Sequence, residues 1–279
     1  MNKQRPLLEG LLFSAITICL SYIVFWGPIA VFKVPTISFV SKVRGPIWAI
    51  ILFLIGGFVP SLVAIILTRI REGTEGLKSL LKRCFQFRLG LHWYLAIIIV
   101  VLLGSAGQLI IHSLLGNSFE FSLYLAQLPS FILLISIGPI SEELGWRGYL
   151  LSKLQLKWNA LVSSVLIGIV WAFWHLPLFF LIGTSQHELH LPFMGFLVGT
   201  IAVSIIFSWI NNNTNNSIWA AILLHWLYTY AAQVNSTGVT RSLEYNWLEY
   251  SPYVLIAIVV VVIWKPKNLS LKKTDLNAG

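Results

Sequence analysis

The sequence predicts an all-α membrane protein, a polytopic bundle of transmembrane helices with about eight spans. Of its 279 residues, 57% are hydrophobic and only 10% are charged. Soluble globular domains carry about 25% charged residues, so this class of protein is excluded. Apolar runs of about 20 residues, the length a helix needs to cross a bilayer, recur along the whole chain. The runs lack strand-like alternation of apolar and polar residues, so helical spans are expected.

The first four spans are expected at residues 7–32, 47–68, 91–115 and 128–151. The first follows Lys3 and Arg5 and is longer than a signal-peptide core, which indicates a retained helix. The second ends where the basic segment beginning at Arg69 starts. The fourth contains the apolar run 131–140, and charged residues come directly after this run.

The remaining spans are expected at residues 160–182, 192–210, 218–234 and 252–264. The Asn-rich stretch 211–216 is typical of a tight turn and separates the sixth span from the seventh. The last span is short, but Tyr253 and Trp264 supply interfacial aromatic residues and Lys265 follows at once. A six-span arrangement stays open if two weaker segments are re-entrant or lie at the membrane interface.

Lysine and arginine are divided unevenly between the two sets of connecting segments. With a cytoplasmic N-terminus, fifteen of the 19 fall in inner segments, and four fall in outer segments: Lys33, Lys42, Arg44 and Arg241. Positive residues concentrate on the cytoplasmic side, so both termini are expected in the cytoplasm of a multi-pass protein of the cell (plasma) membrane. The lysines and arginines behind the net charge of +9 are thus explained by their place in the connecting segments. Membrane lipids are therefore the expected partner, and no nucleic acid is expected.

Two adjacent carboxylates and a guanidinium lie at the end of the fourth apolar run. They belong to Glu142, Glu143 and Arg147. Even one Asp, Lys or Arg at the centre of a membrane helix costs roughly 2.5–3.5 kcal/mol, so three ionisable groups indicate a functional site. Residues four apart share a helix face, which predicts that Glu143 pairs with Arg147. Glu142 points about 100° away, is expected to have no local partner, and is the better candidate for a general base.

Three more polar side chains lie inside the following apolar segments. His175 is in the fifth span, Asn211 at the inner end of the sixth and His225 in the seventh. Hydrolysis of a peptide bond needs a group that orients water and donors for the oxyanion, and these residue types supply both. Each also has a structural alternative: His175 could bond a carbonyl freed by Pro177, Asn211 could cap a helix, and His225 could be a packing residue. Glu142, Glu143 and Arg147 could likewise be a structural ion network.

Together these residues resemble the motifs of a known family. The motifs are Glu-Glu-x-x-x-Arg at 142–147, an aromatic residue and His175 with three residues between them, Phe-x-x-x-Asn at 207–211, and the later His225. Their order and spacing are similar to those of the CAAX prenyl endopeptidase and bacteriocin-processing family of intramembrane proteases. The resemblance implies a membrane-embedded catalytic core at residues 128–234, with N-terminal helices and a basic loop at 1–127 and a last helix and tail at 235–279.

The resemblance also implies a role for each residue. Glu142 would activate water with help from His175, and Glu143 and Arg147 would hold the helix in place. His225 and a polar residue one turn later would stabilise the oxyanion, and Asn211 is expected to supply a further donor. Either no cofactor or Zn²⁺ is expected, and Glu142, His175 and His225 would form an ordinary zinc ligand set. The expected partner is a membrane-associated peptide or protein substrate, reached through a cavity that opens towards the cytoplasm.

Two positions depart from the family pattern. Trp171 stands where the second motif usually has Phe, and it is expected to keep the packing role. Thr229 stands one turn after His225, where an Asn is usual. A threonine hydroxyl donates one hydrogen bond and an amide NH₂ donates two, so weaker oxyanion stabilisation is expected.

Two other classes of function compete with the peptidase. A proton-coupled transporter could relay protons through the same acid and histidines, but the sequence lacks the inverted repeats typical of such carriers. A catalytically weak or silent membrane protein that binds partners in immunity or regulation would tolerate Thr229. The peptidase is the preferred interpretation because it accounts for all four motifs at once.

Overall fold

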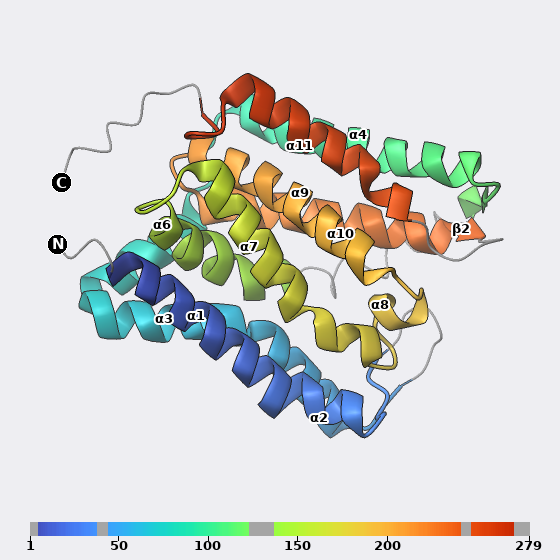
Figure 1. The fold of residues 1–279 in the computed structure, drawn as a ribbon, viewed down its shortest axis with the longest axis horizontal. Helices are drawn as coiled ribbons and strands as arrows, with labels where there is room; N and C mark the ends of the chain where they lie inside the picture. Colours follow the sequence, from blue (N-terminus) through green and yellow to red (C-terminus); the bar gives the residue numbers. More distant parts are fainter. Residues whose placement is uncertain (1–4, 38–43, 123–136, 241–246, 271–279) are drawn as a thin grey trace.

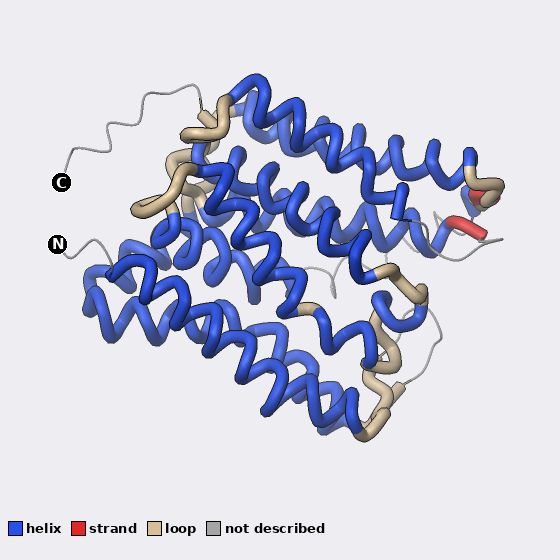
Figure 2. The backbone as a smooth tube through the Cα atoms, viewed as in Figure 1, coloured by secondary structure: helices blue, strands red, loops and turns tan. Residues whose placement is uncertain are grey.

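The structure is a computed structural model that describes residues 5–37, 44–122, 137–240 and 247–270. Short connections join helices through almost all of these ranges (Figure 2). Within them, the regular strands are β1 (Ser118–Phe119) and β2 (Val239–Thr240), which pair as a two-residue antiparallel ladder. The predicted all-α class is confirmed.

The first third of the chain forms a helical hairpin followed by a third long helix. Its elements are α1 (Arg5–Cys19), the π-helical turn η1 (Leu20–Phe25), α2 (Trp26–Val31), α3 (Ile47–Lys82), the 3-10 turn η2 (Arg83–Phe85) and α4 (Leu91–Leu114). Gly73 has a φ of 72° inside α3 and separates its last nine residues from the long part before it. A positive φ is the conformation that glycine adopts without steric cost, so the helix changes direction there.

The second half of the chain forms the rest of the bundle. Residues 137–143 are helical and continue into η3, a π-helical segment (Leu144–Leu150), and α6 (Leu151–Leu154). The elements that follow are α7 (Ala160–Trp174), the 3-10 helix η4 (Leu176–Phe180), α8 (Ser185–Glu188), α9 (Phe193–Asn213), α10 (Ile218–Gly238), the 3-10 helix η5 (Trp247–Tyr250) and α11 (Ser251–Trp264). Asn159 starts α7 by accepting a 2.8 Å hydrogen bond from the backbone N–H of Val162.

The long helices run roughly parallel or antiparallel to one another across the molecule (Figure 1). α1 begins and α11 ends at the left of Figure 1, whereas α2, α8 and β2 lie at the right. We call the first the inner end and the second the outer end. α7 packs against α9, α9 against α11, and α3 against η3, so η3 lies inside the bundle.

In the part of the chain that the structure describes, six helices are long and apolar enough to cross a membrane: Arg5–Val31, Ile47–Phe85, Leu91–Leu114, Ala160–Phe180, Phe193–Asn213 and Trp247–Trp264. They coincide with six of the eight predicted spans. The predicted span 218–234 forms α10, which is helical but not among the six because it carries polar residues such as His225, Gln233 and Asn235. The predicted span 128–151 begins outside the described residues. The number of spans therefore stays a prediction.

Candidate active site

The segment with the adjacent glutamates is buried, and part of it is a π-helix, which is wider than an α-helix. From Ser141 to Leu151 the side chains are buried, and Glu143 and Arg147 have no exposed surface. Residues 144–150 follow the π-helical pattern, which is often found at functional sites. Gly145 lets α3 come close, because a Cβ at this position would lie 2.7 Å from the carbonyl carbon of Pro60. The absence of a side chain at Gly145 thus lets the segment with Glu142, Glu143 and Arg147 pack closely against α3.

Glu143 holds two cationic or protonatable partners at once. Its Oε1 accepts a 3.0 Å hydrogen bond from Nη1 of Arg147, which confirms the pair predicted from the four-residue spacing. The same oxygen lies 2.8 Å from Nδ1 of His225 on α10. Glu143 therefore ties together two segments that are 82 residues apart in sequence.

Two aromatic rings enclose the Arg147 guanidinium. Its Cζ lies 4.8 Å from the ring centroid of Trp171 and 4.4 Å from that of Phe207. A cation over an aromatic face is attracted by the ring quadrupole, and the attraction grows when water is excluded. The predicted packing role of Trp171 is thus confirmed, since its ring also lies against those of His225 and Phe207.

Glu142 is not without partners, and this expectation from the sequence was wrong. Its Oε2 accepts hydrogen bonds from the indole N–H groups of Trp171, at 2.7 Å, and Trp146, at 3.2 Å. Trp146 lies four residues further along the same helix, so the helix face that Glu142 occupies does offer a local donor. Hydrogen bonds to an ionised carboxylate are the stronger kind, and two of them fix one oxygen of Glu142 in place.

His175 lies at the end of α7, next to the same tryptophan. Its Nδ1 is 2.9 Å from the carbonyl oxygen of Trp171. The carbonyl that Pro177 would free, that of Phe173, instead accepts a hydrogen bond from the hydroxyl of Tyr22. Trp171 therefore contacts Glu142 through its indole and His175 through its backbone, which brings the acid and the histidine together.

The partners of the two histidines fix their tautomers. A carbonyl and a carboxylate only accept, so Nδ1 of His175 and Nδ1 of His225 must each donate. In a neutral ring Nε2 is then an acceptor, and in a protonated ring it becomes a second donor. Each histidine keeps Nε2 as the nitrogen available for chemistry.

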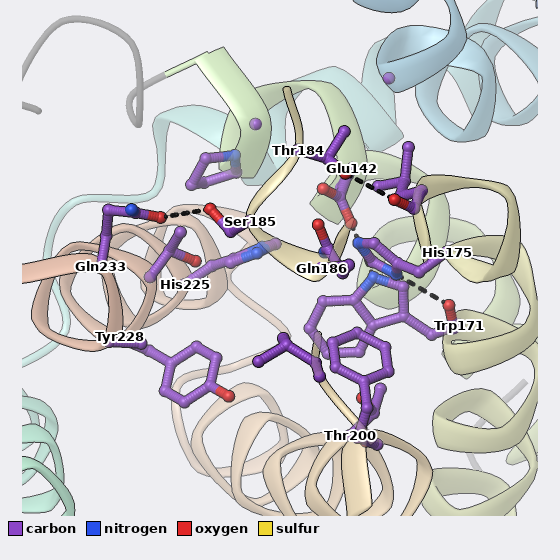
Figure 3. A pocket seen from close by; sticks show the side chains of 18 of the residues that line it. Glu142, Trp171, His175, Thr184, Ser185, Gln186, Thr200, His225, Tyr228 and Gln233 are labelled. Atoms are coloured by element: carbon purple, nitrogen blue, oxygen red, sulfur yellow. Dashed lines mark hydrogen bonds between the residues drawn. The ribbon is translucent and has the colours of Figure 1, made fainter. Parts of the chain in front are cut away.

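A cavity of about 370 Å³ brings the predicted residues together. Glu142, His175, His225 and Thr229 all line it (Figure 3). In Figure 3, Glu142 and His175 lie on one side of the cavity, and Tyr228 and Gln233 of α10 lie on the other. The volume falls in the range of about 300–1,000 Å³ typical of ligand sites.

Several polar lining residues had not been identified from the sequence. They are uncharged, and they come from α4, from the segment around α8 and from α9 and α10: Gln108, Thr184, Ser185, Gln186, Thr200, Tyr228, Gln233 and Ser236. Their only signal in the sequence is a polar side chain inside or beside an apolar run. Among the cavity-lining residues that the structure describes there is no lysine or arginine.

Asn211 lies elsewhere in the bundle. Its side chain is buried, does not belong to the residues that line the cavity, and donates a 3.2 Å hydrogen bond to the carbonyl of Ser217. Asn211 is still inside α9, which is capped by Thr214, so it is not the residue that caps the helix. In this arrangement its amide stabilises the connection between α9 and α10.

The donor set does not fit a metal ion as it is arranged. In the described part of the chain, no three His, Cys, Asp or Glu side chains come together as ligands. One oxygen of Glu142 is held by two indoles, and Nδ1 of each histidine is hydrogen-bonded to a carbonyl or a carboxylate, so the nitrogen left for a ligand is Nε2 in both rings. We therefore derive no step through a metal.

Comparisons with known proteins agree with the resemblance predicted from the motifs. Residues 124–231 match the family model described as Type II CAAX prenyl endopeptidase Rce1-like. The chain is also 29% identical over 205 residues to "CAAX prenyl protease 2" of Methanococcus maripaludis, an alignment that covers 68% of this chain and 74% of the relative. The matched region contains every motif residue. The resemblance is confirmed, and with six apolar helices the chain is a multi-pass membrane protein.

Proposed function

We propose that this chain, with its Rce1-like core, is an intramembrane endopeptidase that hydrolyses peptide bonds of membrane-associated peptides or proteins. The observation that carries the proposal is the shared cavity. A buried carboxylate and two histidines of defined tautomer line one space large enough for part of an extended peptide. The match to a peptidase family supports the same reaction class.

Glu142 and His175 are assigned to the activation of water. The indoles of Trp146 and Trp171 orient the Glu142 carboxylate, and Nε2 of a neutral His175 accepts a hydrogen bond from the water. Glu142 takes a proton from this water as its oxygen forms a bond to the substrate carbonyl carbon. The electron pair of the carbonyl bond moves onto the carbonyl oxygen, which becomes the oxyanion.

His225 is assigned to the oxyanion. For this role Nε2 must donate, so the proposal requires the protonated ring, whose Nδ1 faces the carboxylate of Glu143. Two carboxylates, one guanidinium and one imidazolium then sum to zero charge, which is what a buried site requires. Protonated Glu142 gives its proton to the amide nitrogen as the carbon–nitrogen bond breaks, and the carboxylate is restored.

Asn211 and Thr229 are the two further candidates for oxyanion donors. Thr229 lines the cavity one turn after His225, whereas Asn211 is not among the lining residues, so Thr229 is closer to the reaction space than Asn211. Asn211 would have to leave the carbonyl of Ser217 and turn towards the cavity before its amide could contribute. We therefore assign the second donor to Thr229 and a supporting role to Asn211.

The test is cleavage of a reporter peptide by the purified protein in liposomes. The reporter carries one apolar membrane segment with a fluorophore and a quencher on either side of it. The wild type is compared with Glu142→Gln, and Glu75→Gln makes the same chemical change at an exposed position of the inner end. Cleavage by the wild type and by Glu75→Gln, with loss in Glu142→Gln, is expected. Equal cleavage by all three would overturn the assignment.

Thr229 favours a second candidate, a catalytically weak or silent protein that acts in immunity or regulation by binding partners. This second candidate predicts a different result in the reporter assay. It predicts that the wild type does not cleave the reporter, and that a cellular phenotype of the protein survives Glu142→Gln.

A further inference from the structure

The helical segment after Gly73 has an outward face of basic and apolar side chains. Along α3 and η2 these exposed residues are three or four positions apart, which is the spacing of one helix face, and two more follow closely. They are Lys78, Leu81, Lys82, Phe85, Phe87 and Arg88. The ring centroids of Phe85 and Phe87 lie 6.3 Å apart, so the two parts form one surface. We call these six residues the basic–aromatic surface.

This surface lies between two helices that are apolar enough to cross the membrane. A helix crosses the apolar core of a bilayer in about 20 residues, so α3, which begins at Ile47, reaches the interface close to Arg69. Gly73 then interrupts the helix, and α4 starts the next apolar stretch at Leu91. Segments that lie in the interface combine Lys or Arg with Phe, Trp or Leu, as this one does. Residues 74–90 are thus placed at one membrane interface, at the inner end of the bundle (Figure 1).

The opposite face of the same segment is anchored to η3. Leu80 belongs to a small buried apolar cluster that includes Leu144. Arg83 donates hydrogen bonds to the carbonyl oxygens of Gly148 and Arg147, at 3.0 and 3.3 Å. Because both contacts reach η3, the backbone under the basic–aromatic surface is held in place and its side chains are presented together.

The charges of this surface are only partly neutralised by the protein. Lys78 lies 2.8 Å from Glu75, but in the described part of the chain no acidic side chain forms an ion pair with Lys82 or Arg88. Cations at this level are attracted to anionic headgroups, and exposed leucine and phenylalanine side chains gain from contact with the acyl region beside them. A partner with both an anionic head and apolar chains therefore fits the surface better than a soluble anion does.

We propose that the basic–aromatic surface binds anionic phospholipids, with their phosphate groups at the cations and their upper acyl chains against the leucine and phenylalanine side chains. Bound lipid then restrains η2, and the hydrogen bonds of Arg83 pass this restraint to η3, which directly follows Glu142 and Glu143. The effect on cleavage rests on the proposed peptidase function, whereas the binding of lipid does not.

Native mass spectrometry of the detergent-solubilised protein tests the binding. It measures dissociation constants at the tightest site for phosphatidylglycerol and for zwitterionic phosphatidylcholine with the same chains. The double variant Lys82→Gln/Arg88→Gln is compared with Lys157→Gln/Lys265→Gln, which removes two exposed cations from other connections of the inner end. Each cation near an anionic surface contributes a factor of about five, so the first variant should bind phosphatidylglycerol about 25-fold more weakly and the control should be unchanged. Equal losses in both variants, or no preference for phosphatidylglycerol in the wild type, would overturn the proposal.

Two further measurements separate a lipid from a soluble anion. Glycerol 3-phosphate carries the phosphate group without acyl chains, so at the same concentration it should not displace phosphatidylglycerol. Phe85→Ser removes an exposed ring and no charge, and it should weaken the binding of both lipids severalfold. Displacement by glycerol 3-phosphate, or unchanged binding in Phe85→Ser, would show a site for soluble anions and overturn the proposal.

Reporter cleavage in liposomes tests the effect on η3. The liposomes contain phosphatidylcholine alone or phosphatidylcholine with phosphatidylglycerol. The wild type and Lys157→Gln/Lys265→Gln are expected to cleave severalfold faster when phosphatidylglycerol is present, whereas the rate of Lys82→Gln/Arg88→Gln should not depend on it. A wild-type rate that is equal in both liposomes would refute the link through Arg83. If lipid binding follows the expected pattern and no liposome supports cleavage, the peptidase function fails and the lipid-binding surface stands.

Discussion

The charged side chains of the inner and outer halves of the bundle have different partners and different burial. At the inner end, Lys153 contacts Glu9, which is buried, and Glu72, which is half exposed at the surface, each at 2.7 Å. In the outer half, Glu142 is held by two neutral indoles, and Glu143, Arg147 and His225 form a buried cluster between the two halves. Surface ion pairs typically contribute about 0–1 kcal/mol, whereas breaking a buried one costs about 3–5 kcal/mol. The comparison teaches that the inner charges anchor the protein and the buried ones build the site.

The largest effect is expected from Glu142→Gln. The amide oxygen of glutamine can still accept from the two indoles, so the fold should persist, but no general base is left in the cavity. The initial rate of reporter cleavage should fall by about 10²–10⁴-fold. The thermal midpoint in detergent should match that of the wild type. A loss of only a few-fold with unchanged stability would mean that another group activates water.

Glu143→Gln tests whether a buried ion pair contributes more to the free energy of unfolding than an exposed one. It leaves Arg147 and His225 without their shared carboxylate, so unfolding should become easier by about 3–5 kcal/mol. The matched change Glu72→Gln removes one contact of Lys153 at the inner surface and should alter stability by less than about 1 kcal/mol. Denaturant unfolding in detergent measures both. Similar destabilisation by the two variants would contradict the division of roles.

Trp171→Phe isolates the hydrogen bond that this chain adds to the usual motif. The ring continues to cover Arg147, but the 2.7 Å donor to Glu142 is lost. A hydrogen bond to a charged group contributes about 1.5–3 kcal/mol, so kcat should fall about tenfold or more with little change in KM. Trp174→Phe is the control, because its indole donates to Ser21 and not to Glu142. Equal losses in both variants would point to packing alone.

The smallest effect is expected from Thr229→Asn. An amide can donate twice where the hydroxyl donates once, so kcat should rise severalfold if Thr229 faces the oxyanion. Thr229→Val, which keeps the shape and removes the donor, should lower kcat by up to about 10²–10³-fold, the usual effect of losing one such donor. If both variants cleave at the wild-type rate, Thr229 has no part in the reaction.

Local spacing predicted what a helix face determines. The Glu143–Arg147 pair followed from a separation of four residues, and the structure confirms it. The same spacing places the indole N–H of Trp146 beside Glu142, a local donor that a search for charge pairs does not find. The grouping of His225 with Glu143 needed the tertiary fold, since no local rule joins residues 82 apart.

Depth within the bundle was not predictable from the motifs. Arg147 had been counted with the inner segments, yet it is fully buried, and removing it from the count leaves the charge bias towards the inner end intact. Asn211 shows the same limit, since its motif position did not reveal that its amide bonds to Ser217.

The position of the cut in a membrane-spanning reporter of known orientation tests the account most directly. Mass spectrometry of the two fragments, after reaction in liposomes that carry the wild type and its Glu142→Gln variant, locates the hydrolysed bond. The account predicts one cut, made by the wild type only. The same cut with Glu142→Gln, or no cut by the wild type, would contradict it.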